Sequence, residues 1–217
     1  MLNGIQQNPM QERLTQPHPT QTMGNLMVDR KAEISKEDLL RFSWDELIQL
    51  FATLEAPDIT EMHGEYAARL LAQPHWLADI AGRVVLDNPI RGWLCKAFRP
   101  VDGSTGRGYN TFQQGARVVQ RYPMHTLIAP SRFDGKPAYQ LVYRHFLSAC
   151  GTIHMVDEVR RVAPGIYLGL GTYGFTAAQR RIAYPFLLVG PQGNYRGDIG
   201  RERAHFSIGT REIPALY

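Results

Sequence analysis

The sequence predicts a mainly β protein, namely an antiparallel lipocalin-like β-barrel of about eight strands preceded by α-helices. After residue 90, short strand-like segments alternate with turn signals at the spacing of a sandwich or barrel. The pairs Asp134-Gly135 and Pro164-Gly165 are typical of hairpin turns. The strand count bears on function, because a closed barrel of about eight strands leaves room for one small ligand.

The chain of 217 residues is long enough for one domain with a sizeable core. Residues 1–34 are rich in Gln, Asn, Pro and Thr and lack apolar periodicity, so we expect a flexible N-terminal arm there. Residues 35–217 would then form a single barrel domain with leading helices.

A helical pattern begins at Ser35, which is spaced to form an N-cap pair with Asp38. The apolar residues that follow recur at helical spacing and predict one amphipathic helix over about residues 35–55. Its apolar face needs a partner surface, either the barrel exterior or the open end of the barrel. Pro74 begins a second short helix, expected over about 75–86 and ended by Asn88-Pro89.

The predicted strands, in chain order, are 64–71, 90–98, 109–113, 117–128, 138–147, the two strands of a hairpin over 152–174, and 184–190, with a short edge strand over 204–208. Both residues of Asp134-Gly135 suit a type I′ turn, and Pro164-Gly165 joins the strands of the later hairpin. The second strand of that hairpin contains Gly169 and Gly171, which pack nothing and cost backbone entropy. A neighbouring layer or a ligand must therefore approach this backbone closely.

Composition argues against several classes of function. The net charge is +4, but the basic residues are dispersed, so we do not expect nucleic acid as the main partner. Cys95 and Cys150 are far apart and show no metal-ligand spacing, which predicts buried thiols in a reducing compartment and no metal site. The N-terminal stretch lacks an apolar targeting segment, and no apolar run approaches membrane-spanning length, so we expect a cytoplasmic protein without a membrane partner. No glycine-rich phosphate loop precedes a helix, and we expect no cofactor.

The strand over 138–147 supplies the first candidate site residues. Regular alternation places Tyr139, Tyr143 and His145 on one face, which combines apolar bodies with a few directed polar tips, as ligand cavities do. The same face could instead lie on the exterior beneath the N-terminal helix, and we favour the cavity. Such a cavity would also contain Asp157, with Tyr167 or Tyr173, from the hairpin over 152–174. A histidine near a carboxylate could act as a general base there, with a tyrosine as donor to an oxyanion.

Other charged and aromatic residues have structural roles as alternatives to a role in the site. Asp157 and Glu158 are adjacent, so they point to opposite faces and cannot form a facing carboxylate pair. Composition does not decide which face is interior, and we favour a solvated outer face with cross-strand ion pairs over a catalytic role for these charges. Trp93 and Lys96 would lie on opposite faces of a regular strand. Trp93 would then plug the barrel, and Lys96 would face solvent or, inside a cavity, meet an anionic ligand or a carboxylate. His125 could line the same cavity or be a hydrogen-bonded rim residue.

Two segments carry a resemblance to a known family. Gly64-Glu65-Tyr66-Ala67-Ala68 resembles the Gly-x-Trp-x-Gly motif of a small bacterial domain named for it, and residues 93–98, Trp-Leu-Cys-Lys-Ala-Phe, resemble the Trp-x-Gly-Lys-x-Phe motif that follows in that family. This chain has Tyr66 in place of Trp, and Ala68 and Cys95 in place of Gly. The later half of the chain is similar to lipocalin-like barrels in general. The resemblance covers residues 50–98 and implies a calycin-type barrel, which informs the fold more than the function.

Three functional hypotheses follow. In the favoured one, the cavity binds a small hydrophobic or amphipathic molecule with a polar or acidic group, through Tyr139, Tyr143, Tyr167, Tyr173, Trp93 and Lys96. In the second, a cofactor-free isomerase, cyclase or lyase transfers protons through His145, Asp157 and His125. In the third, side chains fill the interior, and the protein is an interaction module or a homodimer. A histidine and a carboxylate at hydrogen-bonding distance inside the cavity would favour the enzyme, and a solid interior would favour the third hypothesis.

Overall fold

The computed structural model describes residues 34–75 and 92–216. Apart from one boundary residue each, the predicted arm over 1–34 and the second helix predicted over about 75–86 lie outside these residues. Among the described residues, no helix is long and apolar enough to cross a membrane.

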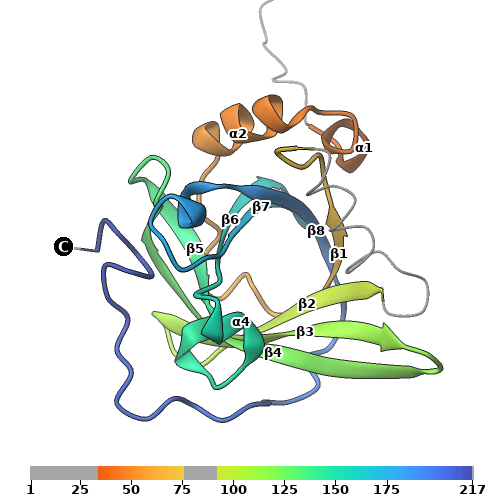
Figure 1. Ribbon diagram of the computed structural model, residues 1–217. Coiled ribbons are helices and arrows are strands. Elements are labelled where there is room, and N and C mark those ends of the chain that lie inside the picture. The colour runs from red at the N-terminus through yellow and green to blue at the C-terminus, as the bar shows by residue number, and fades with distance from the viewer. Residues whose placement is uncertain (1–33, 76–91, 217) are drawn as a thin grey trace, which may run out of the picture. The chain divides into compact units, whose positions relative to one another are not determined.

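The described chain folds into a closed antiparallel barrel of eight strands, in which each strand pairs with its neighbour in sequence and the last returns to pair with the first (Figure 1). This confirms the predicted fold class, because turn-punctuated neighbouring strands give an up-and-down barrel. The strands are β1 (Gly64–Leu70), β2 (Trp93–Pro100), β3 (Thr105–Gln114), β4 (Arg117–Pro130), β5 (Pro137–Val142), β6 (Val156–Ala163), β7 (Ile166–Thr172) and β8 (Tyr184–Gly193).

The predicted helix over 35–55 is two helices, α1 (Lys36–Leu39) and α2 (Trp44–Thr53). The Ser35–Asp38 capping box is confirmed, but Ser43 forms a second capping box with Glu46 and begins a new helix. The prediction of one continuous helix is wrong because this second cap competes with helix continuation.

The apolar faces of α1 and α2 pack on the outside of the barrel. Leu47 and Phe51 lie in one buried cluster with Leu168 of β7 and Leu187 of β8, and Figure 1 shows the two helices across that side of the sheet. Trp44 Nε1 donates a hydrogen bond of 3.0 Å to the carbonyl of Ala183. Of the two partner surfaces considered, the helices therefore cover the exterior.

Both predicted hairpins exist, although one turn differs from the prediction. Pro164-Gly165 joins β6 to β7, with Gly165 at φ +73°. Between β4 and β5 the loop is wider than two residues, since Ser131 N donates to Lys136 O at 2.8 Å and Gly135 N donates to Ser131 O at 3.0 Å. Gly135 has a φ of +73° but Asp134 is not left-handed, so the type I′ prediction is wrong.

The strand predicted over 138–147 ends at Val142. A 3-10 helix, η1 (Tyr143–His145), and a short helix, α4 (Ala149–Thr152), follow it before β6 begins at Val156. Because β-alternation stops at Val142, the predicted faces of the residues beyond it do not apply.

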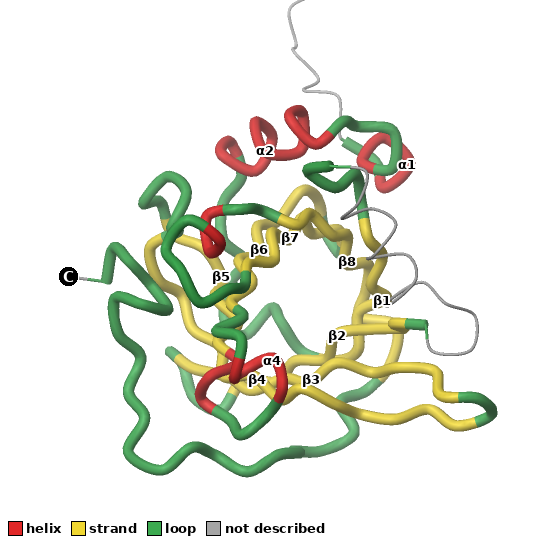
Figure 2. The backbone as a smooth tube through the Cα atoms, viewed as in Figure 1, coloured by secondary structure: helices red, strands yellow, loops and turns green. Residues whose placement is uncertain are grey.

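The segment after β8 runs along the outside of the barrel (Figure 2). It contains no strand, so the edge strand predicted over 204–208 is wrong, and only an isolated bridge joins Glu202 to Phe146. At this bridge Leu147 N donates to Arg201 O at 2.9 Å and Arg203 N donates to His145 O at 2.8 Å, and side chains hold the rest of the segment. Ile213 packs against Val142 and Ala129, and Arg99 forms an ion pair of 2.5 Å with Asp198.

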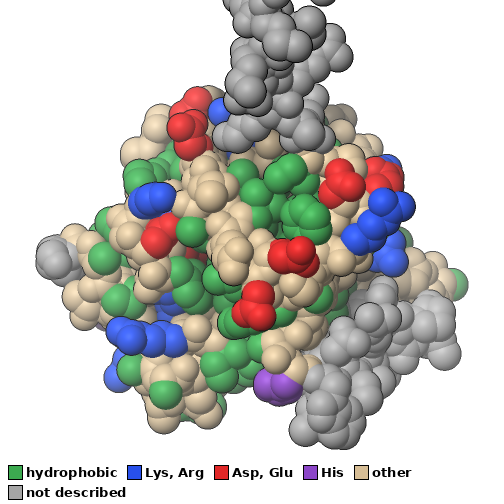
Figure 3. Space-filling view, turned by 90° about the horizontal axis from the view of Figure 1, so that it is seen from above, with side chains coloured by type: hydrophobic (Ala, Val, Ile, Leu, Met, Phe, Trp, Pro, Cys, Tyr) green, Lys and Arg blue, Asp and Glu red, His purple; other side chains and the backbone are tan. Residues whose placement is uncertain are grey.

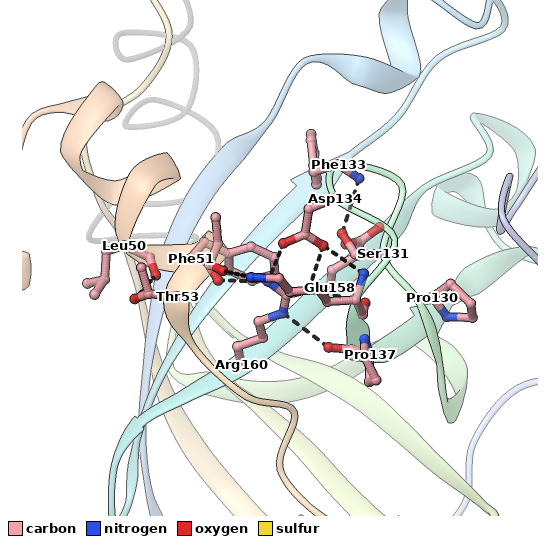
Figure 4. A network of polar contacts seen from close by, with 12 residues as sticks. Leu50, Phe51, Thr53, Pro130, Ser131, Phe133, Asp134, Pro137, Glu158 and Arg160 are labelled. Carbon is pink, nitrogen blue, oxygen red and sulfur yellow. Dashed lines mark hydrogen bonds and ion pairs between the residues drawn. The ribbon is translucent and has the colours of Figure 1, made fainter.

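Charges of both signs are interspersed on the face drawn in Figure 3, which shows no patch of one sign. On the outer face of β6, by contrast, the charged side chains are buried and not exposed to solvent. Arg160 is fully buried, and its guanidinium donates to both oxygens of Asp134 at 2.7 Å (Figure 4). The guanidinium also donates to the carbonyl of Phe51 at 2.8 Å and lies over the Phe51 ring, 4.4 Å from its centroid. Arg160 thus joins the end of α2 to the β4–β5 hairpin.

Glu158 lies on the same outer face and is also buried. Its Oε1 accepts a hydrogen bond of 2.8 Å from the backbone N–H of Arg132, and burial raises the pKa of this carboxyl. The expectation of a solvated outer face for these charges is wrong, because α2 and the β4–β5 hairpin cover it.

Inside the barrel, one end is packed solid. The chain before β1 brings Met62 into this end, where it joins a buried cluster that includes Tyr66, Phe98, Tyr139 and Tyr167. The aromatic rings pack edge to face, with Phe98 and Tyr139 centroids 5.5 Å apart. The other end of the interior is hollow.

Candidate functional site

The hollow part of the barrel is a cavity of about 670 Å³, lined by residues of every strand except β5 and by the η1–α4 region. Most of the lining is apolar. The aromatic residues of the wall are Trp93, Phe112, Tyr122, Tyr143, Tyr173, Tyr184 and Phe186, and its other polar residues are Lys96, Asn110, Asp157, Gln73, Gln113, Gln114 and Arg121.

A β-bulge brings Trp93 and Lys96 to the same side of β2. Trp93 pairs with Phe112, whereas Cys95 pairs with Thr111, so Leu94 is an extra residue in β2. Both side chains therefore line the cavity. The prediction that they lie on opposite faces is wrong because it assumed a regular strand.

Lys96 is the centre of a buried polar cluster. Its Nζ donates hydrogen bonds to Asp157 Oδ2 at 2.6 Å, to the Tyr143 hydroxyl at 2.5 Å and to Asn110 Oδ1 at 3.0 Å. The side chains of Lys96 and Asp157 are only 3% and 4% exposed. A cavity-facing Lys96 was expected to meet an anionic ligand or a carboxylate, and in the structure it meets the carboxylate of Asp157.

The other members of the cluster tie it together. The Tyr143 hydroxyl donates to Asp157 Oδ2 at 2.8 Å and accepts from Asn110 Nδ2 at 3.2 Å. Trp93 Nε1 donates to Asn110 Oδ1 at 3.1 Å. Burial, together with the charge of Asp157, raises the pKa of Tyr143 well above its ordinary value, so Tyr143 remains a neutral phenol.

Cys150 also lines the cavity. Burial raises the pKa of its thiol to about 12. A thiolate is the reactive form of cysteine, so this thiol is a poor nucleophile at neutral pH.

The glycines of β7 fulfil the expectation of a close approach. The Phe186 ring lies over Gly169, where a Cβ would overlap it. Gly171 lies opposite Asp157 in the β6–β7 pair. The neighbouring strand β8 therefore approaches the backbone at Gly169 through the Phe186 ring, whereas Gly171 lines the cavity.

Two of the predicted ligand contacts lie in the solid end of the barrel. The Tyr139 hydroxyl donates to Thr126 Oγ1 at 2.8 Å, and the Tyr167 hydroxyl donates to Glu61 Oε1 at 2.8 Å. Neither residue lines the cavity. Their placement in a ligand pocket is wrong because Met62 and its neighbours fill that end. Tyr143, Tyr173, Trp93 and Lys96 do line the cavity, as predicted.

The two predicted catalytic histidines lie together on the outside of the barrel. The rings of His125 and His145 stack with centroids 4.7 Å apart, and His145 Nε2 is 3.8 Å from Glu202 Oε2. His145 leaves the interior because η1 interrupts the alternation of β5. Burial, with the neighbouring His145, lowers the pKa of His125 to about 4. The expectation that these histidines share a cavity with Asp157 is wrong, since no described histidine lines it.

The sequence reading missed Asn110 and Phe186. Asn110 carries a signal, because asparagine is depleted in strands and this one lies between the strand formers Tyr109 and Thr111. Phe186 gave no signal, since an aromatic residue in an apolar strand reads as ordinary core. Within residues 34–75 and 92–216, no group of three or more His, Cys, Asp or Glu side chains is arranged to hold a metal ion.

Fold and cavity together define this protein as a closed eight-stranded antiparallel barrel with one hollow end. No protein-family model matches the chain, and no curated protein matches it. A crystal structure of a protein from Thermomonospora curvata is similar at 12% sequence identity, with a TM-score of 0.43, and the match covers 68% of this chain and 87% of that one. The family resemblance of residues 50–98 stays a prediction, and the functional argument depends on the geometry of this chain.

Proposed function

We propose that the protein binds a small, largely apolar molecule with a polar or acidic group inside the barrel cavity. One observation carries this proposal: a cavity of about 670 Å³ has mostly apolar walls and, on one wall, a buried cluster of hydrogen-bonded polar side chains. Small-molecule sites typically have this composition and a volume of this order.

The apolar body of the ligand would contact the aromatic walls, chiefly Trp93, Tyr173 and Phe186. The Trp93 and Phe186 rings pack against each other with centroids 5.7 Å apart, so this part of the wall is formed without a ligand. A preformed wall lowers the entropy lost on binding. The polar group would meet the cluster of Lys96, Asn110, Tyr143 and Asp157.

A second candidate function is a cofactor-free isomerase, cyclase or lyase. The observation that favours it is a carboxylate and a phenol 2.8 Å apart within the cavity, in Asp157 and Tyr143. Asp157 would accept a proton and Tyr143 would return one. His125 and His145 have no role in this reaction, because neither lines the cavity. The enzyme hypothesis is tested by measuring whether a bound ligand is converted to a product.

The test of binding is native mass spectrometry of protein purified gently from its source, followed by denaturation and identification of any released molecule. Cys150→Trp should block the cavity and abolish the ligand mass. Leu147→Trp is the matched control, because Leu147 belongs to the same loop region but is 48% exposed and does not line the cavity. Wild-type protein that carries no ligand and binds no apolar probe would contradict the proposal. A ligand that leaves with an altered structure after incubation would favour the enzyme.

A further inference from the structure

The donors of the polar cluster are already engaged. Lys96 Nζ directs its three hydrogen bonds to Asp157, Tyr143 and Asn110. The Tyr143 hydroxyl and the Trp93 N–H each donate within the cluster as well. Asn110 Nδ2 contacts the Tyr143 hydroxyl and the carbonyl of Tyr122. A ligand that needs a donor from this wall must therefore break an existing hydrogen bond.

One acceptor of the cluster remains unused. Both hydrogen bonds to the Asp157 carboxylate reach Oδ2, and Oδ1 accepts none from the residues described. The side chain is 4% exposed and lines the cavity, and Oδ1 is not among the fully enclosed polar atoms without a partner. A buried carboxylate oxygen favours a hydrogen-bond donor because an unsatisfied polar group is costly.

Gly171 keeps the space beside this oxygen open. Asp157 and Gly171 are cross-strand partners, so a side chain at position 171 would lie on the same face. A Cβ there would lie 3.2 Å from Asp157 Oδ1. The backbone of Gly171 is not left-handed, and therefore does not itself require glycine.

The charges near Asp157 Oδ1 determine which kind of ligand group can donate a hydrogen bond to it. The Lys96 ammonium, 2.6 Å from Asp157 Oδ2, already neutralises the carboxylate. A cationic amine placed at Oδ1 would be repelled by this ammonium. A carboxylate would place its own oxygens against Oδ1. A neutral hydroxyl can donate to Oδ1 without either penalty.

We propose that the ligand's polar group is a neutral hydroxyl, on an alcohol or a phenol, which donates a hydrogen bond to Asp157 Oδ1 in the space left by Gly171. The inference rests on the proposed binding function and narrows its ligand class from polar or acidic molecules to hydroxyl compounds.

The experiment measures binding of three probes to the full-length protein by isothermal titration calorimetry: naphthol, its methyl ether, and the naphthoate anion substituted at the same position. The ether keeps the apolar frame but has no donor, and the anion has only acceptors. We expect naphthol to bind about tenfold or more tightly than the ether, the range for a hydrogen bond to a charged acceptor. Naphthoate should bind more weakly than naphthol.

Gly171→Ala places a methyl group beside Oδ1 and should remove the preference for naphthol while the ether still binds. Gly103→Ala is the matched control, because a Cβ at position 103 meets nothing within 4 Å, and it should keep the preference. The double variant Lys96→Met/Asp157→Leu removes both charges at similar volume, and should bind naphthol and ether equally.

The outcomes separate the two proposals. Equal binding of naphthol and ether to the wild type, or tightest binding of naphthoate, would overturn the hydroxyl inference while leaving the binding function intact. Retention of the naphthol preference in Gly171→Ala and in the double variant would also overturn it. Binding of none of the three probes would count against the cavity as a binding site, and the inference would fail with it.

Discussion

The interaction of Lys96 with Asp157 can be tested through stability. The substitution Lys96→Met keeps the length and apolar character of the side chain but removes the ammonium. It leaves the Asp157 carboxylate, with a side chain only 4% exposed, without the partner that lies 2.6 Å from its Oδ2. Removing one member of a buried ion pair costs about 3–5 kcal/mol because the remaining charge is uncompensated. For a chain of this length, that lowers the melting temperature by on the order of 10 °C.

The assay is a double-mutant cycle by urea denaturation, with Lys96→Met, Asp157→Leu and the double variant. We expect each single variant to be strongly destabilised and the double variant to recover to within about 1 kcal/mol of wild type, because hydrophobic replacement of a buried pair is often neutral. Lys36→Met is the control, since Lys36 forms an exposed pair with Glu37 at 3.7 Å and should contribute less than about 1 kcal/mol. A loss below about 1 kcal/mol for Lys96→Met, with no recovery in the double variant, would refute the reasoning.

Three further predictions concern other parts of the barrel. Arg160→Met should destabilise the protein by about 1–3 kcal/mol, because it removes the guanidinium hydrogen bonds to Asp134 and to the carbonyl of Phe51; urea denaturation measures this. Gly169→Ala should cost about 1–3 kcal/mol and reduce probe binding, because the new Cβ displaces the Phe186 ring from the cavity wall. His125 has a pKa lowered from 6.5 to about 4, so the unfolded state binds a proton first and stability should fall as the pH drops from about 6.5 to 4. His125→Gln should flatten that pH dependence of the urea midpoint, and an unchanged slope would contradict the assignment.

Much of the fold was predictable because its signals are local. Turn residues such as Pro164-Gly165 fix where strands end, and antiparallel neighbours then pair in sequence order. The capping box at Ser35 agrees with the apolar periodicity that follows it, whereas the capping box at Ser43 interrupts that periodicity. Local signals can compete, and here the hydrogen bonds of the second cap end the continuous helix.

The site was less predictable because it depends on irregularities in the strands. Lys96 and Asp157 were both identified as candidates, yet their pairing requires the bulge at Leu94 and the closure of the barrel. The assignment of His145 failed because regular alternation was extended beyond Val142, where η1 begins. A one-residue bulge or a helical turn moves every later side chain of a strand to the other face. The alternation of polar and apolar residues in the sequence does not reveal where such an irregularity occurs.

Net stability does not by itself account for the polar cluster around Lys96. A buried ion pair usually contributes little net stability relative to hydrophobic residues of the same volume, because desolvation offsets the attraction between the charges. The packed end of this barrel shows that apolar and aromatic side chains can fill the interior, as Tyr66 and Phe98 do there. The polar cluster instead lies on the wall of the hollow end, and no residue that the structure describes donates a hydrogen bond to Asp157 Oδ1. If recognition is its role, a saturating hydroxyl probe should raise the unfolding free energy of the wild type by more than that of Lys96→Met/Asp157→Leu, since only ligand bound to the folded state adds stability.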